Sequence, residues 1–190
     1  MDGPATIAQI TYLKNLKALP DDFESMTKAE ASHLINLALK KKQAEDKLFD
    51  KAVKYSPERY LNPGWIRYYV DAGVSDNGGP KQNCRVVVVR DLEVIDDIEA
   101  GSMTNNEGEF YAILLAVSHI HGNGDKVEIF SDSQIAVNVS NRTWNANASN
   151  LAVYAEKVWK EIEKHPFVII KWVKRDDNLA GFYIAQHYGL

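Results

Sequence analysis

Two stretches near the start of the chain have apolar residues at helical spacing. Thr6 with Gln9, and Thr27 with Glu30, have the spacing of a capping box, in which two side chains together cap the start of a helix. After each pair, apolar residues recur every three or four positions, which is typical of an amphipathic helix. We therefore predict two helices, the first of which ends at Pro20. Their apolar positions are Ile7, Ile10, Leu13 and Leu16 in the first helix and Ala31, Leu34, Ile35, Ala38 and Leu39 in the second.

Proline and glycine residues interrupt this pattern between residues 56 and 64. A weaker helical pattern continues from the second helix to Val53, and Asn62-Pro63-Gly64 then breaks the chain. We place a domain boundary here, with a small helical unit at residues 1–60 and a second domain at residues 61–190. Two roles of the small unit remain open, an arm that contacts nucleic acid or a scaffold for partner docking. The lysines that would serve the arm are interleaved with acidic residues, and they are Lys14, Lys17, Lys40, Lys41 and Lys42.

From Trp65 onward, short apolar runs separated by turn residues replace the helical spacing. Three predicted strands joined by short turns, one of them at residues 76–80, indicate an antiparallel meander. The fourth strand is reached through a helix, so we expect it to run parallel to the first. The fold class is therefore α/β, a five-stranded mixed sheet in the order β-β-β-α-β-α-α-β-α with helices on both faces. The predicted strands are residues 65–70, 83–90, 92–98, 127–130 and 168–173, and the predicted helices are residues 109–121, 133–139, 151–164 and 178–187.

Composition places the chain among globular proteins of ordinary size. Its 190 residues are 45% apolar and 25% charged. The longest apolar runs, such as Val86–Val89, are far too short to cross a bilayer, and no leader of basic and then apolar residues opens the chain. The single cysteine, Cys84, cannot form an internal disulfide, which suits a reducing compartment. We therefore expect a cytoplasmic protein without membrane contact.

Three acidic residues stand where a fold presents side chains to a substrate. Asp71 closes an apolar strand, Glu109 opens an apolar helix, and Asp132 follows a second apolar strand. If the two strands are neighbours, the three carboxylates meet, and we expect them to bind a divalent metal ion, because Mg²⁺ prefers hard oxygen ligands. The net charge of −4 argues against a strongly basic nucleic-acid-binding protein. Clustered acids contribute to that charge, however, and a bound cation offsets them locally.

The segment from Tyr69 to the end of the chain resembles type 1 ribonuclease H. The resemblance covers residues 65–187 and leaves the small helical unit outside. It implies a ribonuclease H-like fold, with hydrolysis of the RNA strand of RNA–DNA hybrids as the activity. Four motifs, in this order and at this spacing, carry the resemblance, and they are Val70-Asp71-Ala72-Gly73, Thr104-Asn105-Asn106-x-Gly108-Glu109-Phe110-x-Ala112, Phe130-Ser131-Asp132-Ser133-Gln134 and Trp172-Val173-x-Arg175-x-x-Asn178.

The resemblance also implies a catalytic centre. Asp71, Glu109 and Asp132 would be the catalytic residues and would bind Mg²⁺ or Mn²⁺ in a two-metal mechanism. Where the family has a fourth carboxylate in its last helix, residues 179–182 read Leu-Ala-Gly-Phe. Asp177, beside Asp176 and just upstream, is the candidate replacement as a metal ligand. The alternative is that these two aspartates only cap the helix.

Substrate contacts can be carried over in the same way. Thr104, Asn105, Asn106 and Gln134 would contact the hybrid, because amide side chains read 2′-hydroxyls and base edges without sequence preference. The alternative for the two asparagines is helix capping. Trp144 is a further candidate, packed against a DNA sugar, and its alternative is a place in the apolar core.

Three functions remain open from the sequence. The first is a metal-dependent ribonuclease H, which the segment Thr104-Asn105-Asn106 favours. The second is a DNA-cutting nuclease of the same fold, such as a resolvase or integrase, because a fold alone does not determine the substrate. The third is a nucleic-acid-binding module without strong catalysis, which the missing fourth carboxylate motivates. The oligomeric state is open as well.

Overall fold

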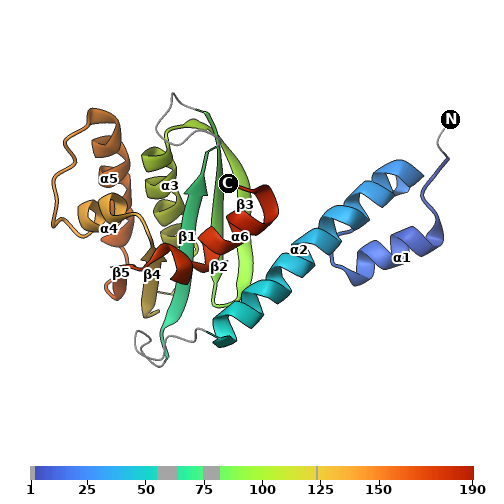
Figure 1. The fold of residues 1–190 in the computed structure, drawn as a ribbon, viewed down its shortest axis with the longest axis horizontal. Helices are drawn as coiled ribbons and strands as arrows, with labels where there is room; N and C mark the ends of the chain where they lie inside the picture. The colour runs from blue at the N-terminus through green and yellow to red at the C-terminus, as the bar shows by residue number, and fades with distance from the viewer. Residues whose placement is uncertain (1–2, 55–63, 75–81, 123) are drawn as a thin grey trace. The chain divides into compact units, whose positions relative to one another are not determined.

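The computed structural model describes residues 3–54, 64–74, 82–122 and 124–190 (Figure 1). Contacts divide the chain into two compact units, Met1–Lys47 and Leu48–Leu190. The predicted turn at residues 76–80 lies outside the described residues, as does the predicted boundary segment apart from Gly64. The division into residues 1–60 and 61–190 therefore stays a prediction.

The chain begins with two capped helices, α1 (Ile7–Asn15) in the first unit and α2 (Lys28–Lys54), which continues beyond the end of that unit at Lys47. Both predicted capping boxes are confirmed. The Thr6 hydroxyl accepts a hydrogen bond from the backbone N–H of Gln9 at 3.2 Å, and the Thr27 hydroxyl accepts one from the N–H of Glu30 at 3.3 Å. A 3₁₀ turn, η1 (Phe23–Ser25), lies between the helices, and a small cluster among the described residues buries Leu13, Met26 and Ala31.

The predicted end of the first helix at Pro20 is wrong, because α1 ends at Asn15. Lys17 has a φ of 54°, in the left-handed region, and the N–H of Ala18 bonds to the carbonyl of Leu13 at 2.9 Å. This closure satisfies a free carbonyl of the last turn and redirects the chain. The weaker pattern after the second predicted helix is helical throughout, since α2 runs without a break to Lys54.

The second unit is built on a five-stranded sheet with the strand order β3-β2-β1-β4-β5 (Figure 1). The first three strands pair antiparallel, while β4 pairs parallel with β1 and β5 pairs parallel with β4. The predicted mixed sheet and element order are confirmed. The strands are β1 (Ile66–Gly73), β2 (Gln82–Arg90), β3 (Glu93–Met103), β4 (Val127–Ser131) and β5 (Val168–Trp172).

Helices cover both faces of this sheet. Side chains alternate along a strand, so Tyr68, Val70 and Ala72 of β1 share one face, where they join the apolar core under α3, α4 and α5. The opposite face of β1 and β2 carries α6, and a Cβ placed at Gly73 would lie 3.0 Å from Ile184 of that helix (Figure 1). The helices are α3 (Asn105–Ser118), α4 (Gln134–Ser140), α5 (Ser149–Ile162) and α6 (Leu179–Tyr188), with a 3₁₀ turn η2 (Arg175–Asp177) before the last.

Three element boundaries differ from the predicted ones by enough to matter for the site. β1 continues to Gly73, so Asp71 lies inside the strand, opposite Val87 of β2, and not at its end. β3 continues to Met103, beyond the predicted end at residue 98. α3 begins four residues before the predicted start at Glu109, because Thr104 caps it. In each case, tertiary pairing or a cap extends the element beyond its apolar run.

The helices of the described residues include none that combines the length and the apolar character needed to cross a membrane.

Candidate metal centre

Two of the three predicted acidic residues come from adjacent parallel strands. Tyr69 of β1 pairs with Phe130 of β4, and their rings stack with centroids 5.0 Å apart. Two residues beyond each partner stand Asp71 and Asp132. Because parallel strands keep their register, this pairing brings the two aspartates together at the carboxyl ends of β1 and β4. We call this end of the two strands the sheet edge. Asp71 is fully buried, whereas Asp132 is partly exposed.

The third acid, Glu109, is held at this edge by the way α3 starts. Thr104 and Glu107 form a capping box, and the Glu107 side chain accepts hydrogen bonds from the N–H and hydroxyl of Thr104 at 2.8 and 2.9 Å. Gly108 lets the helix approach the sheet closely, since a Cβ there would overlap Cys84 Sγ and lie 2.8 Å from Ala72 Cβ. The capping acid and the site acid are therefore two different residues, with Glu109 left to face the sheet edge.

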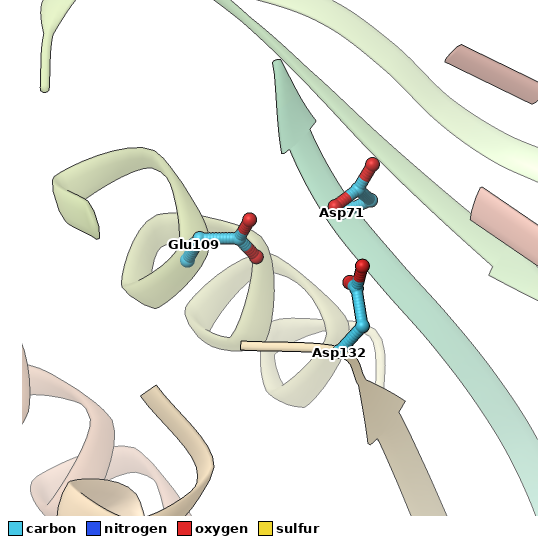
Figure 2. Close-up of side chains that lie close together, drawn as sticks. All are labelled: Asp71, Glu109 and Asp132. Atoms are coloured by element: carbon cyan, nitrogen blue, oxygen red, sulfur yellow. The ribbon is translucent and has the colours of Figure 1, made fainter. Parts of the chain in front are cut away.

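The structure brings these three carboxylates together. One oxygen each of Asp71, Glu109 and Asp132 lies within 4.8 Å of the others, and Figure 2 shows the three side chains converging from β1, α3 and the end of β4. Glu109 is only 4% exposed, and its Oε2 is buried without a hydrogen-bond partner among the described residues. An unpaired buried carboxylate oxygen is costly unless a cation satisfies it. The donor set and this free oxygen fit a hard divalent cation.

The electrostatics of the group agree with that fit. Burial, and next the charge of Asp132, raise the pKa of Asp71 to about 7. Burial, followed by the charges of Asp71 and Asp132, raises the pKa of Glu109 well above its ordinary range. Carboxylates crowded in this way resist ionisation, and a bound divalent cation removes that penalty. The arrangement is therefore unfavourable as a purely structural element and suitable for holding a metal ion.

A cation that the sequence analysis gave no role, Arg175, lies at the same place. Its Nη1 donates to Asp71 Oδ1 at 2.9 Å and Oδ2 at 2.8 Å, and to Asp132 Oδ2 at 3.1 Å. Asn178 completes the contacts, with its Nδ2 donating to Asp132 Oδ1 at 2.7 Å and to the Val70 carbonyl at 2.9 Å. Both residues belong to the last sequence motif, so that motif was the signal that could have found them.

The structure does not bring Asp177 into this group. Asp176 and Asp177 are exposed in the turn η2, outside the three carboxylates that converge. The N-cap of α6 is Asn178, whose side chain accepts from the N–H of Ala180, so the capping alternative does not hold for them either. The position four residues after Asn178 is Phe182. A role of Asp177 as a metal ligand stays a prediction.

Among the predicted substrate contacts, Asn105 is the one that shares a cavity with the acids. Asn105 lines a cavity of about 430 Å³ together with Glu109, Asp132 and Arg175. Thr104 is the N-cap of α3, so the two asparagines do not serve as its cap. Asn106 and, at the start of α4, Gln134 are exposed. These positions leave the polar groups accessible to a ligand at the sheet edge.

Trp144 is 49% exposed and follows α4. The alternative that this side chain belongs to the apolar core is therefore wrong. Its contact with a DNA sugar stays a prediction.

We expect the metal-free protein to lose stability as pH rises from about 4 to about 7. The folded pKa of Asp71, about 7, lies above its ordinary value of 3.8, so the folded state binds more protons than the unfolded state between these values. The free energy of unfolding therefore falls with rising pH through this window. Thermal unfolding in a chelator, compared with the variant Asp71→Asn, isolates the effect, because asparagine is neutral at every pH. Parallel pH profiles for the two proteins contradict this prediction.

Comparison with known proteins bears on most of the second unit. The model of the RNase H family matches residues 65–181. A curated relative, EbsB of Enterococcus faecalis, carries a provisional name as a hydrolase. It is 26% identical over 125 residues, which cover 64% of this chain and 91% of EbsB.

Solved structures share the fold. RNase H1 from the halophilic archaeon Halobacterium salinarum NRC-1 is 24% identical, with a TM-score of 0.53, and the match covers 62% of this chain and 91% of that one. LC11-RNase H1, in complex with an RNA/DNA hybrid, is 20% identical, with a TM-score of 0.51, and the match covers 60% of this chain and 88% of that one. The family model covers more than half of the chain, and its span includes all three converging carboxylates. The chain therefore belongs to the RNase H family.

Proposed function

We propose that this protein is a metal-dependent endoribonuclease that hydrolyses the RNA strand of RNA–DNA hybrids. The observation that carries the proposal is the convergence of Asp71, Glu109 and Asp132 within 4.8 Å at the edge of an RNase H sheet. The cavity beside them, with Asn105 in its wall, offers room for a sugar–phosphate unit. Membership of the RNase H family and the hybrid bound to LC11-RNase H1 support the choice of substrate.

The three acids would bind the metal, and Asn178 would orient one of them. Asp71, Asp132 and Glu109 would hold Mg²⁺ or Mn²⁺, with Glu109 also orienting a water molecule near the scissile phosphate. When bound, the metal acts as a Lewis acid on the phosphate and lowers the pKa of water. Asn178 fixes Asp132 through the 2.7 Å hydrogen bond to Oδ1, so that this carboxylate keeps one orientation.

Contacts to the substrate would come from the side chains around the acids. Thr104, Asn105, Asn106 and Gln134 lie at the starts of α3 and α4. We assign these four residues contacts in the minor groove of a hybrid. Amide groups that bond to 2′-hydroxyls distinguish RNA from DNA without reading its sequence. Trp144, half exposed, is the further candidate for packing against a DNA sugar. The cytoplasmic location stays a prediction.

A second candidate function is a nucleic-acid-binding module with little or no catalysis. Two observations favour it. Phe182 stands where a fourth carboxylate is expected, and the Arg175 guanidinium already bonds to two of the three acids. With fewer anionic ligands, a second metal ion would be held weakly. The two candidates differ in whether metal promotes cleavage.

We expect cleavage of the RNA strand in a labelled RNA–DNA hybrid, and no cleavage of duplex DNA or duplex RNA of the same sequence. The assay compares Mg²⁺, Mn²⁺ and a chelator, with strand-specific labels read on a denaturing gel. Hybrid cleavage that needs metal supports the proposal, because the carboxylates alone supply no Lewis acid. Cleavage of duplex DNA instead would identify the other nuclease class, and hybrid binding without any cleavage would identify the binding module.

A further inference from the structure

The guanidinium of Arg175 lies between the two aspartates of the candidate metal centre. Nη1 alone donates to both oxygens of Asp71 and to Oδ2 of Asp132, at 2.8–3.1 Å. The two contacts to Asp71, at 2.9 and 2.8 Å, have the distances of charge-assisted hydrogen bonds, and the contact to Asp132 is longer, at 3.1 Å. Asp71 and Asp132 would also be ligands of a divalent ion, because such ions take carboxylate oxygens as ligands. The guanidinium and the ion would therefore compete for the same two carboxylates.

The place of the guanidinium is built into the fold and does not come from a chance contact of a surface side chain. Gly181, in the first turn of α6, leaves the space that Arg175 fills. A Cβ at Gly181 would lie 3.2 Å from both Cζ and Nη1 of Arg175 and 3.1 Å from Asp71 Oδ2. Any larger residue there would press on the ion pair from the helix side. The absence of a side chain at position 181 therefore leaves the ion pair uncrowded from this helix.

The two partners of the ion pair differ in their exposure to solvent. Asp71 is fully buried, while the Arg175 side chain is 50% exposed. The arginine can therefore leave toward solvent by rotating its side chain, whereas Asp71 stays in β1 and needs another cation whenever it is ionised. Arginine stays protonated throughout the accessible pH range, so it cannot give way by losing its charge.

We propose that Arg175 is a resident cation that competes with the divalent metal ion for Asp71 and Asp132. The site accordingly binds metal only when the guanidinium withdraws, and its metal affinity is lower than the three carboxylates alone would give. This inference rests on the proposed metal site, and it holds whether or not the protein cleaves RNA.

Direct metal binding tests the competition. Mn²⁺ affinity is measured by titration calorimetry on the full chain, and free Mn²⁺ is followed by electron paramagnetic resonance. We expect Arg175→Gln to bind Mn²⁺ at least about tenfold more tightly than the wild type, because a positive charge a few ångströms from the ion is removed. The metal-induced rise in melting temperature should grow in parallel. Arg175→Lys retains the positive charge, so its affinity for Mn²⁺ should be lower than that of Arg175→Gln and closer to that of the wild type.

The matched control is Lys174→Gln, which removes one positive charge from the neighbouring, exposed residue. Screening limits its effect to less than about threefold in affinity. In the double variant Arg175→Gln with Asp132→Asn, the gain in affinity should disappear. Equal or weaker binding by Arg175→Gln overturns the competition but leaves the metal site in place. Absence of metal binding in both the wild type and Arg175→Gln overturns the site itself and this inference with it.

A second measurement uses the wild-type protein, in case Arg175→Gln folds poorly after leaving Asp71 without its partner. Titration of the diamagnetic ion Mg²⁺ is followed on the ¹⁵N signals of the arginine side chains. The signal of Arg175 is identified by its absence from the spectrum of Arg175→Lys. We expect this signal to shift, and its protons to exchange faster with water, as Mg²⁺ binds to the wild type. An unchanged Arg175 signal at saturating Mg²⁺ contradicts displacement.

Discussion

Asp132→Asn should reduce cleavage of the RNA strand by about a thousandfold or more while leaving the fold intact, because several kcal/mol of charge stabilisation is lost with one ligand. The neutral amide can still accept from Asn178 Nδ2, which bonds to Oδ1 at 2.7 Å in the wild type. The bond from Trp172 Nε1 to the backbone carbonyl of residue 132, at 3.0 Å, does not involve the substituted group. Initial rates on a labelled hybrid, with circular dichroism as the test of folding, measure both parts of the prediction.

The control for charge is Asp176→Asn, which makes the same change at an exposed residue of η2. It should keep nearly the full wild-type rate, since exposed charges are screened by salt. Both variants are purified in parallel with the wild type, so that a contaminating nuclease would appear in all three. Full activity of Asp132→Asn contradicts the assignment of this residue to the site.

Gly108→Ala should destabilise the protein, although alanine is the better helix former by about 1 kcal/mol. Gly108 lies inside α3, where a Cβ would overlap Cys84 Sγ of β2 and approach Ala72 Cβ of β1 to 2.8 Å. Overpacking of this kind costs about 1–3 kcal/mol, and β1 cannot shift easily because it lies in the middle of the sheet. We expect a net loss of about 1 kcal/mol, or roughly 3 °C in melting temperature, measured by chemical and thermal unfolding.

Displacement of α3 would also move the adjacent Glu109, so metal binding should weaken in the same variant. The matched control is Gly124→Ala, because a Cβ at Gly124 meets nothing within 4 Å. That substitution should change the free energy of unfolding by less than about 0.5 kcal/mol. In a Cys84→Ala background, the penalty of Gly108→Ala should shrink, since the nearest obstructing atom is absent. A Gly108→Ala protein as stable as the wild type contradicts the close packing of α3 on the sheet.

The resident arginine explains how the site can fold without a metal ion. Without a partner, Asp71 would be a buried charge in the middle of the sheet, which proteins avoid. Arg175 supplies the partner in the metal-free state, and Asn178 supplies a neutral donor to Asp132. The site can therefore fold before metal arrives, with the ion pair in place of the metal.

Much of the fold could be predicted from local patterns along the chain. The order of strands and helices follows from apolar periodicity. The spacing of apolar residues differs between a helix and a strand, and it can be read from short segments of the sequence. The same is true of the capping boxes at Thr6 and Thr27, whose partners stand three residues away. The three acids were recognised as candidates because each follows or opens an apolar run.

Element ends were predicted less well, and the reason is physical. The strand β1 continues beyond its apolar run to Gly73 because β2 continues to pair with it, which no local pattern records. The helix α1 stops at Asn15, five residues before Pro20, because Lys17 adopts a left-handed conformation that redirects the chain. An apolar run marks burial, whereas an element ends where its backbone hydrogen bonds end.

By itself, the sequence determined the α/β class, the element order and the family, since these depend on periodicity and on motifs of a few residues. Only the tertiary structure decided how the site is assembled. Arg175 and Asp71 are 104 residues apart, and Asn178 and Asp132 are 46 apart, yet each pair is hydrogen-bonded. Such contacts arise from strand pairing and from the packing of α6 on the sheet, so the chemistry of one residue cannot reveal its partner before the chain has folded.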